Sequence, residues 1–194
     1  MDTLVIDLPG GWLRGVRRVE SPNADCRPAG VAADLIVVHA ISLPPGEFGG
    51  AAIDELFCNR LDPSAHPYFC DIAALKVSAH ALIRRDGHVT QYVPFHLRAW
   101  HAGQSSYKGR EACNDFSVGI ELEGCDSSLF EDAQYRSLSQ LIFALRRAYP
   151  TLATAPVVGH DEIAPGRKTD PGPAFNWQRL TDMISHNDNR PRLV

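Results

Sequence analysis

Residues 35–41 (LIVVHAI) constrain the fold more strongly than any other segment of the chain. Six of these seven residues are apolar, and β-branched side chains dominate, which predicts a short strand that is buried along its length. The loop-forming run Ser-Leu-Pro-Pro-Gly follows at once and ends the strand. His39 therefore lies near the C-terminal edge of a buried strand.

Further strands and helices follow from periodicity. Residues 77–93 form two alternating apolar runs around Asp86-Gly87, a strong hairpin signal. Other strands are expected at 116–122 and 155–158. The apolar stripe of residues 132–149 predicts an amphipathic helix with Asp132 as N-cap and Pro150 as its stop, and shorter helices are expected at 50–59 and 176–186. These elements predict an α/β fold: a single domain with a central mixed β-sheet flanked by α-helices.

Length and composition favour one globular domain spanning residues 1–194. The chain carries a net charge of -4 and is 44% hydrophobic, which is typical of a soluble protein. No clustered basic surface is expected, so nucleic acid is not predicted as a partner. The tail from Asn187 to Val194 (NDNRPRLV) is expected to be solvated and frayed.

Targeting features point to the cytoplasm. The N-terminal segment MDTLVIDLPGG has acidic residues and no basic region before an apolar run, unlike a secretory signal. No apolar run approaches the roughly 18 residues that a membrane span needs, so no membrane partner is expected. The five cysteines are spread out without a CxxC pair, which predicts reduced thiols in the cytoplasm. The protein is expected to be a monomer.

Three residues form a candidate metal site. His39 ends one strand, His160 follows the apolar run 155–158, and Asp170 lies in the proline-rich loop RKTDPGP. Two imidazoles and one carboxylate make a three-ligand zinc set that leaves the fourth position for water, as in catalytic sites. The spacing alone is a weak signal, because no local motif such as HExxH brings these residues together. His160 could equally begin a polar turn, and Asp170 could cap the helix expected at 176–186.

Two charged residues are candidates for catalysis. Glu121 lies in the strand segment GIELEG, where Glu121 and Glu123 share one face, and one of the two is expected to be solvated. A glutamate beside a metal-bound water could take its proton and deliver it to a leaving amine. Lys168 could stabilise a tetrahedral oxyanion. Exposed salt bridges are the ordinary alternative for both side chains.

Several segments together resemble a known family over most of the chain, from about Trp12 to about Trp177. They are VVHAISLPPGEFGG, DPSAHPYF, SAHALIRRDGHVTQYVPF, RAWHAGQSSYKGRE, CNDFSVGIELEG and GHDEIAPGRKTDPGPAFNW. In this order they resemble the AmpD-type 1,6-anhydro-N-acetylmuramyl-L-alanine amidases of Gram-negative bacteria. Wider relatives are the zinc-dependent type 2 amidases and the peptidoglycan recognition proteins.

The resemblance implies one zinc ion per chain, held by His39, His160 and Asp170, with Glu121 as the base and Lys168 as its electrostatic partner. It also implies a hydrolase: the amide between the lactyl group of anhydro-muramic acid and L-alanine would be cleaved in recycled, soluble cell-wall muropeptides. Two rival functions stay open, a recognition module that binds murein peptides without cutting them and an amidase that acts on intact murein.

Substrate contacts are less constrained by the sequence. Trp100 and Tyr68 offer aromatic surfaces, of which Trp100 suits a sugar ring, and Lys76 and Arg167 could pair with peptide carboxylates. His101, beside Trp100, is expected to be structural or to support a ligand, because a fourth protein ligand would close the metal site. The chain departs from the family pattern at Ala40, Lys76 and Ala112, where close relatives often have asparagine, arginine and arginine, so substrate preference is expected to differ.

Overall fold

The structure is a computed structural model that describes residues 4–188. Its centre is a six-stranded sheet in the order β12-β5-β11-β6-β7-β3. Neighbouring strands are parallel except for the antiparallel pair β6 and β7, so the expected mixed sheet is confirmed. Its strands are β12 (Val157–Gly159), β5 (Leu35–Ile41), β11 (Ser117–Glu123), β6 (Ala81–Ile83), β7 (Val89–Gln91) and β3 (Arg17–Arg18).

The strand β5 is an interior strand, second from one edge of this sheet. It pairs with β12 on one side and with β11 on the other, and both pairings are parallel. Leu35, Ile36, Val37 and Val38 are at most 1% exposed. The uninterrupted apolar run therefore reflects a strand that is covered on both faces.

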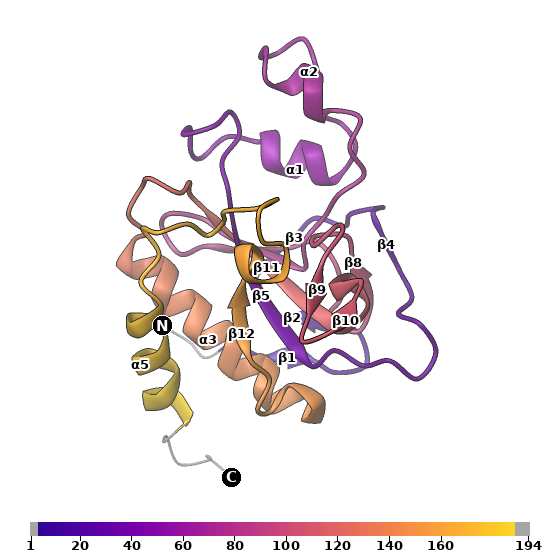
Figure 1. The fold of residues 1–194 in the computed structure, drawn as a ribbon, viewed down its shortest axis with the longest axis vertical. Coiled ribbons are helices and arrows are strands. Elements are labelled where there is room, and N and C mark those ends of the chain that lie inside the picture. Colours follow the sequence, from indigo (N-terminus) through magenta and orange to yellow (C-terminus); the bar gives the residue numbers. More distant parts are fainter. Residues whose placement is uncertain (1–3, 189–194) are drawn as a thin grey trace.

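The two long helices, α3 (Asp132–Ala148) and α5 (Trp177–Asp188), pack together beside the sheet (Figure 1). The two short helices, α1 (Ala52–Phe57) and α2 (Phe69–Ile72), lie away from them, at the top of the view. Leu138 and Leu141 of α3 share one hydrophobic core with Ile120 of the sheet. The short helices pack in a second cluster around Phe57.

The start of α3 differs from the prediction. Glu131, not Asp132, is the N-cap, and it forms a capping box in which the Gln134 side chain accepts a bond from the Glu131 N–H at 3.0 Å. This reciprocal arrangement satisfies two backbone donors at once, so the helix begins at Asp132, one residue earlier than predicted. The predicted end before Pro150 is confirmed.

Strands of only two residues were not predicted, because two residues are too few to show a hydrophobic period. The turn at Asp86-Gly87 connects β6 and β7 as predicted, with Gly87 at a φ of 85°. Of the unpredicted strands, β3 joins the central sheet. The others form three small ladders: β1 (Ile6–Asp7) with β2 (Trp12–Leu13), β4 (Ala24–Asp25) with β8 (Arg98–Ala99), and β9 (Ser106–Tyr107) with β10 (Arg110–Glu111). Two 3-10 turns, η1 (Cys113–Phe116) and η2 (Pro150–Leu152), and the short helix α4 (His160–Ile163) complete the fold.

The C-terminal tail is described only as far as α5 extends. That helix ends at Asp188, and residues 189–194 of the tail expected to be solvated lie outside the described residues. Between residues 4 and 188, none of the helices combines the length and the apolar character needed to cross a bilayer.

The packing of α3 on the sheet predicts a large cost for truncating its buried face. Leu138 is 0% exposed, so Leu138→Ala is expected to lower the free energy of unfolding by about 2–5 kcal/mol. The exposed Arg136 on the same helix provides the control, and Arg136→Ala is expected to change stability by less than about 0.5 kcal/mol. Urea unfolding of both variants measures the difference, and equal midpoints would contradict this packing.

Candidate active site

Three parallel strands deliver polar residues to one edge of the sheet. His39 of β5 and Glu121 of β11 are register partners, so their side chains leave adjacent strands at the same level. Gly159, the last residue of β12, pairs with Val38, which places His160 beside His39. Because parallel strands end at a common edge, residues far apart in sequence meet there.

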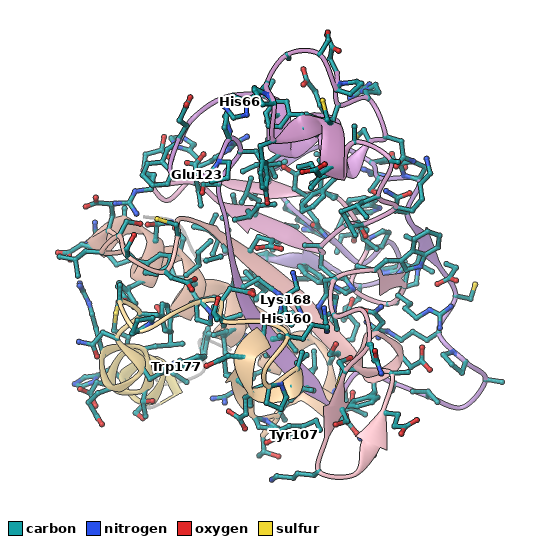
Figure 2. The ribbon with its side chains drawn as sticks, turned by 45° about the horizontal axis from the view of Figure 1, so that its top comes forward. His66, Tyr107, Glu123, His160, Lys168 and Trp177 are labelled. Atoms are coloured by element: carbon teal, nitrogen blue, oxygen red, sulfur yellow. The ribbon has the colours of Figure 1, made fainter. Side chains whose placement is uncertain are left out.

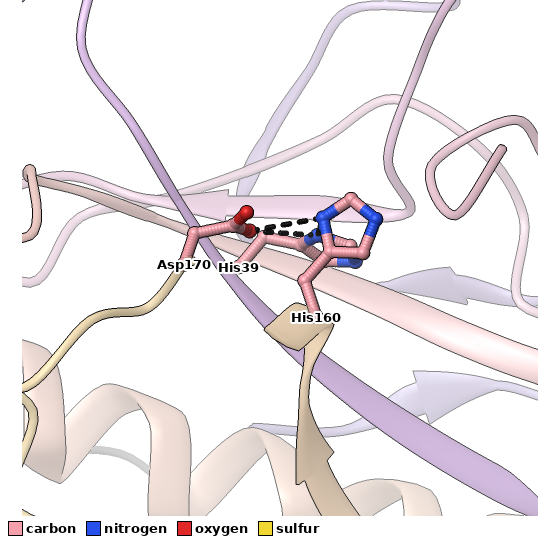
Figure 3. A group of neighbouring side chains, drawn as sticks. All are labelled: His39, His160 and Asp170. Carbon is pink, nitrogen blue, oxygen red and sulfur yellow. Dashed lines mark hydrogen bonds and ion pairs between the residues drawn. The ribbon is translucent and has the colours of Figure 1, made fainter. Parts of the chain in front are cut away.

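His39, His160 and Asp170 converge through one atom each (Figure 3). The two Nδ1 atoms lie 2.9 Å apart, and Asp170 Oδ2 lies 3.2 Å from His39 Nδ1 and 3.1 Å from His160 Nδ1. Ligands about 2.0–2.1 Å from a tetrahedral zinc ion lie roughly 3.3 Å apart. The three atoms are therefore spaced as zinc ligands are, and no other such group of metal-binding residues occurs between residues 4 and 188.

Burial controls the charge of this group. His39 is 1% exposed, and burial lowers its pKa to about 4, so its imidazole is neutral at pH 7. Burial raises the pKa of the Asp170 carboxyl, whereas a hydrogen donor or positive charge at the neighbouring His160 and His39 rings lowers it below the ordinary range. A neutral imidazole and an ionised carboxylate are the forms that bind a metal.

Glu121 is the buried acid next to this group. It is 8% exposed, and its Oε2 atom has no hydrogen-bond partner within the described residues. Burial raises the pKa of Glu121 well above its ordinary value, and the nearby Asp170 carboxylate raises it further, while Lys168 opposes both effects. Such an acid is suited to holding and releasing a proton near neutral pH.

Glu123 corrects an expectation, because neither glutamate of the strand is solvated. Glu123 is 2% exposed and accepts bonds from the Gly49 N–H and from Arg84 Nη1, both at 2.7 Å, and from the Arg85 N–H at 3.2 Å. A central strand has both faces covered, so sequence alternation could not identify a solvent side. Glu123 anchors a loop, whereas Glu121 keeps an unpaired oxygen.

The labels of Lys168 and His160 stand next to each other in Figure 2, and both residues line the same pocket. Lys168 belongs to the loop after α4, and its backbone N–H donates to the Ala164 carbonyl at 3.0 Å. The residue is exposed, and its charge acts on both Glu121 and His39. A cation in this position can stabilise negative charge that develops beside the metal group.

His101 is not placed as a fourth ligand. Its Nδ1 atom lies 2.9 Å from His39 Nε2, the ring nitrogen of His39 that points away from His160 and Asp170. The imidazole of His101 thus supports a ligand from behind, as expected from the sequence. Burial, together with the neighbouring His39 and His80 rings, lowers the pKa of His101 well below its ordinary value.

The alternative roles of the loop residues do not match the structure. The Asn176 side chain accepts a bond from the Arg179 N–H at 2.9 Å, so Asn176 rather than Asp170 caps α5. His160 is the first residue of α4, but its ring is buried and faces His39 instead of forming a solvated turn.

A pocket of about 330 Å³ opens above the convergent residues. Its wall includes all five candidates for metal binding and catalysis, together with Trp100 and Tyr68. The Trp100 indole N–H donates to Asp25 at 3.2 Å, and the Tyr68 residue is 41% exposed. Both residues line the pocket beside the candidate metal site.

The two basic residues proposed to bind substrate carboxylates, Lys76 and Arg167, do not line this pocket. Lys76 is exposed. Arg167 Nη2 donates to the Ala102 and Gln104 carbonyl oxygens, both at 2.6 Å, and the residue lines a neighbouring pocket of about 560 Å³ with Ala112. The guanidinium is thus bound to the backbone, a role that the sequence did not suggest.

Comparison with known proteins defines the family. Residues 29–173 match the N-acetylmuramoyl-L-alanine amidase family Amidase_2. The chain belongs to this amidase family. It is 60% identical over 178 residues to the 1,6-anhydro-N-acetylmuramyl-L-alanine amidase AmpD of Escherichia coli K12, covering 92% of this chain and 97% of that protein.

Solved structures of amidases share the fold. A crystal structure of a selenomethionine AmpD derivative superposes with a TM-score of 0.89 at 58% identity and covers 93% of this chain and 99% of that one. The E. coli amidase AmiD, solved in complex with anhydro-N-acetylmuramic acid-L-Ala-D-γ-Glu-L-Lys, superposes with a TM-score of 0.55 at 27% identity and covers 93% and 65%. These relations confirm the amidase resemblance and the architecture predicted from the sequence.

The buried carboxyl of Glu121 predicts a pH-dependent penalty on stability. Its folded pKa is raised, so the folded state binds this proton more tightly than the unfolded state, and stability falls as pH rises above about 4.3. In chelator-treated protein, Glu121→Gln is therefore expected to raise the melting temperature at pH 7 by a few degrees relative to wild type, and by less at pH 5. Calorimetry at both pH values measures this, and a lower melting temperature of the variant at pH 7 would contradict it.

Proposed function

We propose that residues 1–194 form one zinc amidase domain that hydrolyses the amide between the lactyl group of 1,6-anhydro-N-acetylmuramic acid and L-alanine in recycled muropeptides. Family membership and the AmpD relatives support the reaction. The observation that carries the proposal is the convergence of His39, His160 and Asp170 beside a buried, unpaired Glu121 oxygen.

The ligand chemistry favours one zinc ion per chain. His39 and His160 each direct a ring nitrogen, and Asp170 a carboxylate oxygen, towards a common point, which is a donor set typical of catalytic zinc. When bound, zinc supplies a Lewis acid that makes water a good nucleophile near pH 7. The exposed side of the group faces the 330 Å³ pocket, so water and substrate can reach it.

The chain's own residues handle the proton and the charge. Glu121 takes a proton from the attacking water and returns it to the nitrogen of L-alanine, which would otherwise leave as an amide anion. Its low exposure and raised pKa suit both the acceptance and the donation of that proton. Lys168 places positive charge next to the carbonyl oxygen as it becomes an oxyanion.

The pocket wall suggests how the substrate is held. The complex of AmiD with an anhydro-muramyl peptide supports a small muropeptide as the ligand of this pocket as well. We assign the sugar contact to Trp100 and Tyr68, which line the pocket beside the metal group. Lys76 and Arg167 remain candidates for carboxylate pairing at its periphery, in a monomer that acts in the cytoplasm.

The two rival functions are less well supported. A recognition module that binds without cutting has no need of a complete ligand set with an unpaired acid, yet both are present here. An amidase for intact murein would share the same centre, so activity on polymeric sacculi at a rate similar to that on soluble anhydro-muropeptides would favour it.

Metal removal tests the proposed reaction. Anhydro-muramyl tripeptide is expected to be cleaved to anhydro-muramic acid and free peptide by the purified protein, and chelation should abolish cleavage until zinc is restored. Asp170→Ala is expected to lose both zinc and activity, whereas Asp182→Ala, on the exposed face of α5, should retain both. Full activity in the exhaustively chelated protein would contradict a zinc amidase.

Variants of Glu121 and Lys168 test the catalytic roles separately from metal binding. Glu121→Ala is expected to keep one zinc ion per chain but to lose about 10²–10⁴-fold in kcat. Lys168→Met should lose about 10²–10³-fold in kcat, and Lys108→Met, an exposed lysine outside the pocket, should behave as wild type. Near-normal turnover by zinc-loaded Glu121→Ala would exclude this residue as the base.

A further inference from the structure

Both candidate histidine ligands contact the same two-residue segment behind the metal group. His39 Nε2 lies 2.9 Å from His101 Nδ1, and His160 Nε2 lies 3.2 Å from the carbonyl oxygen of Ala102. In each imidazole, the contact is made by Nε2, while Nδ1 faces the metal group. One segment, His101–Ala102, therefore contacts two rings from different elements, β5 and α4.

The segment is fixed by bonds that do not involve the ligands. Asn114 Oδ1 accepts from the N–H of His101 at 3.0 Å and from the N–H of Ala102 at 2.8 Å. Arg27 then holds the turn that carries Asn114, since its guanidinium donates to the Asn114 carbonyl at 3.1 Å and to the Ser117 carbonyl at 2.8 Å. The segment thus rests on a braced scaffold rather than on a free loop.

The donor and the acceptor of each hydrogen bond around His101 can be assigned from the bond between Ser117 and Cys113. Ser117 Oγ lies 2.6 Å from the Cys113 carbonyl oxygen, and two oxygens this close repel unless a hydrogen lies between them. The Ser117 hydroxyl must supply that hydrogen, because a carbonyl has none. Its Oγ then accepts from His101 Nε2 at 3.1 Å, so the proton of the neutral His101 ring is on Nε2.

The same assignment of donors and acceptors extends to the candidate ligands His39 and His160. With its proton on Nε2, His101 can only accept at Nδ1, so His39 donates from Nε2 and keeps a lone pair on Nδ1. His160 Nε2 faces two groups, the Ala102 carbonyl oxygen at 3.2 Å, which can only accept, and Arg167 Nη2 at 3.5 Å, which can only donate. The shorter contact requires that His160 donates from Nε2, so its lone pair is on Nδ1. Two nitrogen lone pairs and a carboxylate then lie about 3 Å apart without a hydrogen of their own, an arrangement that only a cation stabilises.

The sheet leaves space for this arrangement at one residue. A Cβ atom on Gly119 of β11 would lie 2.3 Å from Cγ of His101, closer than any real contact. The His101 ring therefore rests directly on the backbone of the central strand, where only glycine permits it. Packing confines the ring to the position that the hydrogen bonds also require.

We propose that Ser117, His101 and the Ala102 carbonyl form a positioning relay that holds both ligand imidazoles as Nε2–H tautomers with their Nδ1 lone pairs directed at the metal. The inference rests on the proposed metal site and adds residues that never touch the ion. Its function is to prepare the ligands before the metal arrives, which raises metal affinity.

Zinc affinity of the intact protein, measured by competition with a chromophoric chelator, tests the relay. Ser117→Ala removes the hydroxyl that sets the direction, and His101→Leu removes the acceptor for His39. Both are expected to weaken zinc binding by about 10- to 100-fold. His101→Asn, which can place an amide oxygen near the former Nδ1 atom, should recover most of the affinity lost in His101→Leu.

Ser137 provides the matched control. Its hydroxyl is also buried and donates to a backbone carbonyl, that of Gly87, at 2.7 Å, but on α3. Ser137→Ala is therefore expected to bind zinc as wild type does. Wild-type affinity in both Ser117→Ala and His101→Leu would overturn the relay, and so would an equal loss in His101→Asn and His101→Leu, which would indicate a packing role only.

The tautomers themselves can be read in the metal-free protein. ¹⁵N spectra of the imidazoles are expected to show His101 and His39 as Nε2–H forms in wild type, and a shift of His101 towards the Nδ1–H form in Ser117→Ala. Unchanged tautomers in that variant would overturn the proposal. Failure of the wild-type protein to bind zinc would instead remove the proposed amidase function, while the spectra would still decide the relay.

Discussion

The parallel pairing of β5 with β11 is the interaction on which the site depends. Their register joins Leu35 with Ser117 and continues without a break to Ile41 with Glu123. A shift by one residue would turn every side chain of one strand to the opposite face. The register therefore determines that Glu121, and not its neighbour, stands next to His39.

The same strand shows how two identical side chains acquire different properties. Glu121 and Glu123 are two residues apart and both buried, but Glu123 receives three donors, whereas one oxygen of Glu121 has no partner among residues 4–188. Because an unpaired buried carboxyl is costly, its presence marks a position retained for chemistry rather than for stability. Glu123 in turn fixes the segment around Gly49 to the sheet through the bond that it accepts from the Gly49 N–H.

Much of this organisation could be predicted from the sequence, and the remainder follows from contacts that leave no local signal. The limits of β5 and the hairpin turn were predictable because apolar runs and Asp-Gly turns are local. The candidate ligands His39 and His160 could be nominated because His39 lies near the end of an apolar strand and His160 directly follows another. The supporting roles of Ser117 and Asn114 could not be predicted, because serine and asparagine have many ordinary roles and their partners depend on tertiary packing. The burial of Glu123 was equally hidden, because alternation does not reveal which strands are covered on both faces.

The three candidate ligands differ in how they are attached to the molecule. His39 and His160 are tied to the sheet, but Asp170 belongs to a loop whose nearest tether is the bond from the Asp161 N–H to its carbonyl at 3.0 Å. For an ion held by all three, escape requires the loss of one ligand first, and a loop opens at lower free energy than a central strand. The lifetime of an ion held at this site would therefore be governed by the loop that carries Asp170.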